Sequence, residues 1–221
     1  AIRGVAEAAA RSGAARAGQI WLHCDGREPV AALGALRGAV RGAGCLHPAC
    51  VFPPGASTAI RAGCGFAVAG DEVAVEAASG LARDLGGFPV RVPDDARDAY
   101  HGAAVLASNC AAALLAAARD AIASGGVTPD EAKRLVVALA ASAIDAVRDL
   151  GLEAGLSGPI RRGDAATVRR HLEALSGSGD AAAIYRVLSR EVLALARRAP
   201  GEPEEAAAEI ERALGGNEGG W

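Results

Sequence analysis

The sequence predicts an α/β region followed by an all-helical region. Over residues 1–92, short apolar runs of strand type alternate with segments of helical periodicity, which is typical of parallel βαβ units with helices on the faces of a sheet. Over residues 94–199, long alanine-rich segments with a helical repeat follow one another. The composition agrees, because alanine favours closely packed helices and only 3% of the residues are the aromatics that β-sandwiches and barrels use.

The first region is expected to hold four strands and three helices. Residues 1–17 read as the body of an amphipathic helix, and helices at 29–41 and 72–87 carry apolar residues at helical spacing. Glycine closes the last of these helices. A turn at Asp25-Gly26 follows the first strand. The strands are expected at 18–24, 45–48, 64–70 and 88–92.

The second region is expected to hold helices at 100–126, 128–151, 165–176 and 180–199. Thr128 and Glu131 form a capping box around Pro129 at the first helical position. Asp164 and Asp180 are candidate caps of the next two helices. A short helix near 203–214 and a frayed tail complete the chain. The predicted domains are therefore 1–92, 93–199 and a terminal segment, 200–221.

Charge and hydropathy exclude some partners. The 23 basic and 26 acidic residues give a net charge of −3, which argues against nucleic acid and against an anionic membrane surface. The run 102–118 has no charged residue, but it is mostly alanine and shorter than the ~20 strongly apolar residues of a membrane span. We expect it to be a helix buried on most sides of a bundle.

Five cysteines stand at positions 24, 45, 50, 64 and 110, and no secretory signal precedes them. A chain with this much apolar sequence does not need a disulfide framework, so we expect reduced, buried thiols in a cytoplasmic protein. The alternative is a zinc site, but the spacing is at the edge of the usual range and no second paired motif follows. No metal is therefore predicted. The residues of that alternative are His23, Cys24, Cys45, His47 and Cys50.

Polar residues in apolar surroundings mark two candidate sites. His23 and His47 lie where predicted strands end, and the carboxyl ends of parallel strands are where α/β sheets bind ligands. In the helix 100–126, Ser108 lies within about 40° of His101 on the helical wheel and Asn109 about 80° away. This face either serves a ligand or makes helix–helix hydrogen bonds.

The loop SGPIRRGD, residues 157–164, is a further candidate. Arg162 could meet an anionic group and Asp164 could cap the next helix or hold an arginine, although a solvated basic face with a helix cap explains the same residues. A dinucleotide fingerprint is absent. Gly42 and Gly44 are followed by His47 where a third glycine should stand, and Gly63 and Gly65 precede a strand instead of following one.

In order, these segments resemble a bacterial oxidoreductase-like family with a Rossmann-like N-terminal domain and a helical C-terminal domain known as domain of unknown function 2520. The blocks YHGAA with ASN (100–109) and SGPIRRGD (157–164) are the most specific. The supporting segments are LHCDG (22–26), LHPACVF (46–52), FAVAGDE (66–72), LARDLGG (81–87), TVRRHLEAL (167–175) and YRVLSREVLALA (185–196).

The resemblance implies kinship with pyrroline-5-carboxylate reductase, ketopantoate reductase and 6-phosphogluconate dehydrogenase. It implies a partial Rossmann-like parallel sheet followed by a helical bundle of the 6-phosphogluconate dehydrogenase C-terminal type. It further implies an NAD(P)-dependent oxidoreductase acting on a small molecule, with NADP as the expected cofactor, a site between the domains and a homodimer through the helical domain. The alternative is a non-catalytic binding or dimerisation module.

The resemblance also assigns roles to residues. His101, Ser108 and Asn109 would be catalytic, with His101 as the general acid or base. The substrate would meet His47, Arg162 and Asp164, and the cofactor would meet His23, Gly26 and Pro48. The family's first βαβ units, with the glycine-rich phosphate loop, find no match in this sequence. We therefore expect weak dinucleotide binding by this chain alone, and an unpaired strand edge at QIWLHC.

Overall fold

A computed structural model describes residues 1–55, 59–198 and 204–215. The chain divides into two compact units, Ala1–Asn109 and Cys110–Trp221, and each is described by itself. This boundary lies inside a helical segment and not at residue 92, where the strand pattern ends. The expected frayed tail, at 216–221, falls outside the described residues.

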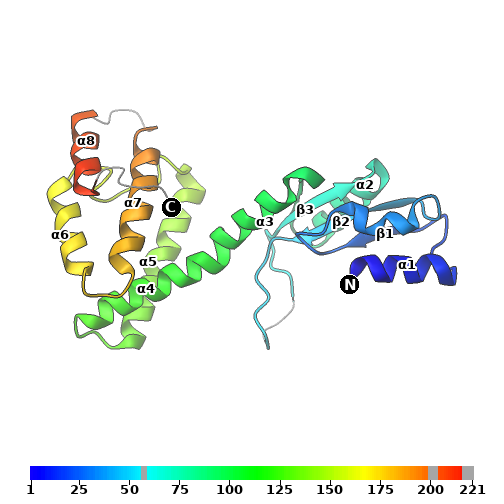
Figure 1. Ribbon diagram of the computed structural model, residues 1–221, viewed down its shortest axis with the longest axis horizontal. Helices are drawn as coiled ribbons and strands as arrows, with labels where there is room; N and C mark the ends of the chain where they lie inside the picture. The colour runs from blue at the N-terminus through cyan, green and yellow to red at the C-terminus, as the bar shows by residue number, and fades with distance from the viewer. Residues whose placement is uncertain (56–58, 199–203, 216–221) are drawn as a thin grey trace. The chain divides into compact units, whose positions relative to one another are not determined.

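The first unit is built on a four-stranded sheet in the order β1-β2-β3-β4 (Figure 1). β1 (Ile20–His23) and β2 (Gly42–Pro48) pair in parallel, as do β3 (Gly65–Gly70) and β4 (Phe88–Arg91). The sheet is thus mostly parallel, as expected for an α/β fold. β2 and β3 pair antiparallel, because the connection between them forms no helix among its described residues and the chain turns straight back.

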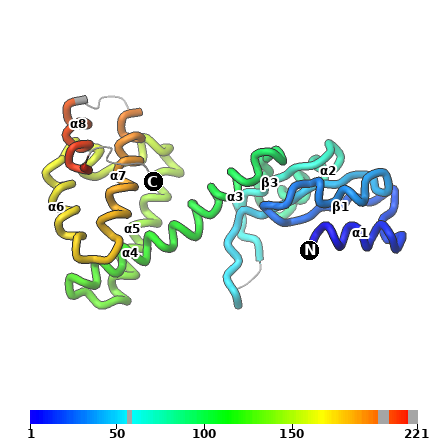
Figure 2. The backbone as a smooth tube through the Cα atoms, in the orientation of Figure 1, coloured from blue at the N-terminus to red at the C-terminus, as the bar shows by residue number. Residues whose placement is uncertain are grey.

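Helical segments cover both faces of this sheet. α2 (Glu72–Asp84) packs on one face, over a core that includes Phe66 and Val68. α1 (Ile2–Ser12) and the 3₁₀-helix η1 (Val30–Leu36) share a second core with Trp21 and Ala43, whose side chains leave the opposite face. Figure 2 traces the backbone of these segments at the blue, N-terminal end of the chain. The helix expected at 29–41 is thus a shorter 3₁₀-helix, and Gly38 follows it with a left-handed φ of 79°.

The helix expected at 100–126 begins earlier and changes its winding. It comprises η2 (Asp94–Ala96), α3 (Arg97–Val105), the π-turn η3 (Leu106–Cys110) and α4 (Ala111–Ser124). The expected burial is wrong for this chain, since none of the most apolar 18-residue window is buried. The reason is that α4 packs mainly against α5 and α7, which leaves the rest of its surface uncovered within the described residues. By length and composition alone, the described run Asp94–Ser124 could cross a membrane, since its most apolar 18-residue window has a mean hydropathy of 1.5.

The second unit contains α4, α5 (Pro129–Leu150), α6 (Ala165–Leu175), α7 (Ala181–Ala196) and α8 (Glu204–Ala213). The capping box is confirmed, because Thr128 Oγ1 accepts from the Glu131 amide at 3.4 Å and donates to its carboxylate. Asp164 caps α6, whereas Asp180 makes no side-chain cap bond. The core lies among α6, α7 and α8 and contains Ile160, Val168, Leu193, Ile210 and Leu214.

Large apolar side chains remain on the surface of α5. Five of them are at least half exposed: Leu135, Val137, Leu139, Ile144 and Leu150. An apolar cavity of about 760 Å³ opens beside them, between α4, α5, α6 and α7. Leu135, Leu139 and Leu150 lie on one side of α5, and exposed apolar side chains grouped in this way mark an interaction face.

The expectation of five reduced, buried thiols is wrong. Cys50 and Cys64 form a disulfide, with their Cα atoms 6.4 Å apart. The antiparallel return explains the pairing, because Ala49 donates to the Gly65 carbonyl at 2.8 Å and so brings the end of β2 to the start of β3. Of the free cysteines, Cys45 is buried, and Cys24 and Cys110 are exposed.

Asp71 connects the sheet to α2 and yields a stability prediction. Its carboxylate accepts from the Ala74 amide at 2.9 Å, as the helix cap, and from the Ala43 amide of β2 at 2.8 Å. We expect Asp71→Ala to lower the free energy of unfolding by about 1–3 kcal/mol, since both amides lose their acceptor. Urea unfolding measures this. Asp180→Ala is the control, and equal losses in the two variants would contradict the account.

Candidate functional site

Six polar side chains gather at the carboxyl ends of β1 and β2. His23 lies opposite Cys45 in the parallel register, and His47 follows on the same face two residues later. The first turns of α3 add three more groups. We call this set the histidine cluster: His23, Cys45, His47, Arg97, Tyr100 and His101.

The ring of His47 is held from two sides. Its Nδ1 lies 2.8 Å from the Tyr100 hydroxyl, and the two rings meet edge to face. On the other side lies the backbone of Gly26, where an added Cβ would approach His47 Cε1 and Nε2 to 2.9 Å. Position 26 therefore needs glycine for the ring to keep this place.

The surroundings keep this pair neutral near pH 7. Burial lowers the pKa of His47, and the neighbouring His101 lowers it further. Burial raises the pKa of Tyr100. A neutral imidazole can accept a proton and a protonated phenol can donate one, and neither group carries a charge before the transfer.

Beneath this pair lies a buried layer. His23 is 6% exposed and Arg97 only 2%. Arg97 donates from Nε to Asp94 Oδ1 at 2.8 Å and from Nη1 to Cys45 Sγ at 3.4 Å. Burial lowers the pKa of His23, with a further contribution from Arg97.

Four buried polar atoms in this cluster have no hydrogen-bond partner within the described part of the chain. They are both ring nitrogens of His23, Nη2 of Arg97 and Nδ1 of His101. Buried polar atoms are nearly always paired, so four unpaired atoms in one place indicate that a ligand or ordered water completes the cluster.

The predicted site residues are only partly brought together. His23, Gly26, His47 and His101 meet in the cluster, and Pro48 follows at the end of β2. The π-turn holds both remaining helix residues: Ser108 Oγ donates to the Ala104 carbonyl at 2.6 Å and to Asn109 Oδ1 at 3.0 Å.

Arg162 and Asp164 belong to the second unit. Asp164 accepts from the Thr167 amide and hydroxyl, at 2.9 and 2.6 Å, and these bonds lower its pKa. The helix-cap interpretation of Asp164 therefore explains its contacts.

Sequence reasoning missed Asp94, Arg97 and Tyr100 and considered Cys45 as a site residue only in the zinc alternative. Cys45 was expected as a buried thiol, and it is free and buried. Tyr100 stood next to His101 in a segment already singled out. Asp94 and Arg97 carried a weaker signal, a carboxylate and a guanidinium three residues apart just before a long apolar helix. Nothing in the spacing showed that the guanidinium turns inward to Cys45.

The described residues do not fit the phosphates of a dinucleotide. α2 is the helix that directly follows a strand, but Asp71 caps its first turn and Glu72 begins it, so carboxylates stand where a phosphate would need free amides. The zinc alternative is not supported either. Cys50 is bonded to Cys64, and the described residues contain no group of three metal-binding side chains.

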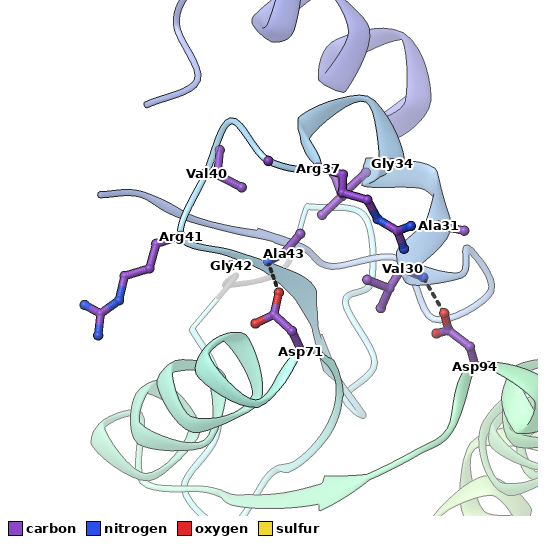
Figure 3. Close-up of a pocket in the computed structure, with 12 residues that line it drawn as sticks. Val30, Ala31, Gly34, Arg37, Val40, Arg41, Gly42, Ala43, Asp71 and Asp94 are labelled. Carbon is purple, nitrogen blue, oxygen red and sulfur yellow. Dashed lines mark hydrogen bonds between the residues drawn. The ribbon is translucent and has the colours of Figure 1, made fainter. Parts of the chain in front are cut away.

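A cavity of about 380 Å³ lies between η1, the start of β2 and the start of α2 (Figure 3), and no residue of the histidine cluster lines it. Arg37, Arg41, Asp71 and Asp94 contribute its charged groups. Both carboxylates are engaged by backbone amides, Asp94 with Val30 at 3.0 Å and Asp71 with Ala43 at 2.8 Å. None of the sequence-predicted site residues lines this cavity.

The buried histidines predict a pH-dependent stability. The pKa values of His23 and His47 lie below the usual 6.5, so the folded state binds these protons less readily than the unfolded state. Their contribution is therefore present above pH 6.5 and is lost as the pH falls through the folded values. We expect the free energy of unfolding to fall from pH 7 to pH 5, and His23→Gln to reduce this fall. Urea titrations at each pH test it, with His171→Gln as control; an unchanged slope in His23→Gln would contradict it.

Comparison with known proteins places the chain. No curated protein matches it. Protein TM1727 from Thermotoga maritima has a similar fold, with a TM-score of 0.67 and 23% identity over 81% of this chain and 69% of that one. The "putative NADP oxidoreductase BF3122" from Bacteroides fragilis matches with a TM-score of 0.58 and 18% identity, over 78% of this chain and 64% of its own. The family model described as Domain of unknown function (DUF2520) matches residues 64–192, more than half of the chain, and the protein therefore belongs to that family.

Proposed function

We propose that the protein is an oxidoreductase that acts on a small molecule, with NADP as cofactor and with His47 and Tyr100 next to the reacting atom. The observation that carries this is the neutral His47–Tyr100 pair at the carboxyl end of a strand, beside polar atoms that lack partners. The fold likeness to a protein named as an NADP oxidoreductase supports the reaction class.

The chain's own part in such a reaction is to bind and move a proton. Tyr100 can donate its hydroxyl proton to a carbonyl oxygen or imine nitrogen, and the phenolate that remains then accepts a hydrogen bond from His47 Nδ1–H. In the reverse reaction the phenolate takes the proton back. His101 lies on the same helix, one residue on, and its unpaired Nδ1 is available to orient the substrate. Ser108 and Asn109, further along this helical run, are proposed as additional substrate contacts.

A second function has an observation of its own. The acidic start of α2 favours a binding or dimerisation module without a dinucleotide site. The two functions differ in whether the cluster binds the nicotinamide end of the cofactor. Reduced nicotinamide mononucleotide is the matching probe, because it lacks the adenosine and its phosphates.

We expect NADPH and reduced nicotinamide mononucleotide to bind this chain with affinities within about threefold of each other, since the described residues form no phosphate cradle that would distinguish them. Tyr100→Phe should weaken both by roughly fivefold, the value of one hydrogen bond of about 1 kcal/mol. Calorimetric titration measures this.

Tyr185→Phe is the matched control, because Tyr185 makes the same type of bond to His171 Nδ1 at 2.9 Å in the other unit. Much tighter binding of NADPH would place a phosphate site within these residues. Absence of binding by both probes would favour the non-catalytic module.

We also propose that the protein is a homodimer through the helical unit. Leu135, Leu139 and Leu150 lie on one side of α5, and Leu139, which is 73% exposed, also lines the apolar cavity. A second copy that covers this face would remove the apolar area from water.

We expect Leu139→Asp to shift the dimer toward monomer, because a buried carboxylate without a partner opposes association. Light scattering at micromolar concentration measures the mass. Val51→Asp is the control, since Val51 is an equally exposed apolar residue, at 69%, in the other unit. A monomeric wild type, or an unchanged dimer in Leu139→Asp, would contradict the interface.

A further inference from the structure

We propose that Arg97 is a positioning residue, whose guanidinium clamps the segment 25–30 onto the sheet and thereby fixes His47 against Tyr100. The inference rests on the proposed function only for the task of His47. The geometry that carries it is a closed set of contacts between four elements of the first unit.

The guanidinium joins two partners from different parts of the chain. Nε donates to Asp94 Oδ1 at 2.8 Å and Nη1 to Cys45 Sγ at 3.4 Å. Arg97 is 2% exposed and Asp94 40%, so the guanidinium is buried while this carboxylate still meets water. The bond to Cys45 is buried on both sides, and a buried guanidinium fork fixes its partners more strictly than a surface pair does.

Each partner of Arg97 holds one end of the segment 25–30. The other oxygen of Asp94 accepts from the Val30 amide at 3.0 Å, a bond drawn in Figure 3. Cys45 Sγ donates to the Asp25 carbonyl at 3.6 Å. One side chain thus anchors both ends of the segment through its two partners.

The anchored segment carries Gly26, which lies against the ring of His47. A Cβ at position 26 would come within 2.9 Å of Cε1 and Nε2, so the backbone there limits the ring on this side. The Tyr100 hydroxyl limits it on the other side, at 2.8 Å from Nδ1. Arg97 and Tyr100 lie three residues apart in α3, so the guanidinium that anchors this helix to β2 also positions the Tyr100 hydroxyl. Arg97 therefore positions both groups that confine the His47 ring, the Gly26 backbone and the Tyr100 hydroxyl.

The test follows two signals by NMR in the whole chain: the ring nitrogens of His47 and the amide exchange of Val30. In Arg97→Met we expect the His47 ring signals to move toward those of a ring without the Tyr100 bond. The Val30 amide should exchange at least about tenfold faster. Gly26→Ala should displace the His47 signals while Val30 stays protected, because the clamp itself is intact. Arg91→Met, at an exposed arginine paired with Glu72 at 2.6 Å, should change neither signal.

If Arg97→Met does not fold, Arg97→Lys replaces it, since lysine keeps the charge but not the two-partner fork. The same shifts, smaller in size, are then expected. Either Arg97 variant leaving the His47 signals in place, or Gly26→Ala leaving them in place, overturns the proposal. Neither readout measures turnover or cofactor binding, so failure here and failure of the proposed function are separate results.

Discussion

The first unit depends on one buried guanidinium. Burying a charge is costly unless it is paired, and Arg97 meets this requirement with Asp94 on one side and Cys45 on the other. Both partners belong to backbone segments that also form the site. Cys45 lies in β2, which pairs with β1 on one side and with β3 on the other, and His23 is opposite Cys45 in β1. Asp94 lies where the chain leaves β4 and enters the helical run of α3. The same pair of bonds therefore stabilises the fold and arranges the histidine cluster.

Cluster and sheet follow from the same strand geometry. Alternation along β2 puts Cys45 and His47 on the face opposite α2, while Leu46 points into the core beneath that helix. The antiparallel return of β3 leaves the carboxyl end of β2 beside the Cys50–Cys64 disulfide. His47 therefore lies near the end of the sheet at which the disulfide links β2 to β3. This crosslink restricts the backbone next to His47 and so helps to fix the orientation of its ring.

Much of this could be predicted from local pattern. The strands at His23 and His47 and the caps at Thr128 and Asp164 follow from period and capping chemistry, which act over a few residues. The antiparallel return, the π-turn around Ser108 and the inward guanidinium of Arg97 could not be predicted in this way. Each depends on which segments of the chain contact one another in the folded protein. From sequence alone, a charged residue at the start of a helix is expected to be exposed to solvent, because charged residues are rarely buried without a partner.

The function proposed for this protein requires that a ligand binds at the histidine cluster. The most direct test is an NMR titration of the chain with reduced nicotinamide mononucleotide, followed through the ring signals of all four histidines. The account predicts saturable shifts of His47 and His101 with a common dissociation constant and no shift of His171. Shifts confined to His171, or to residues around Arg37 and Arg41, would contradict it.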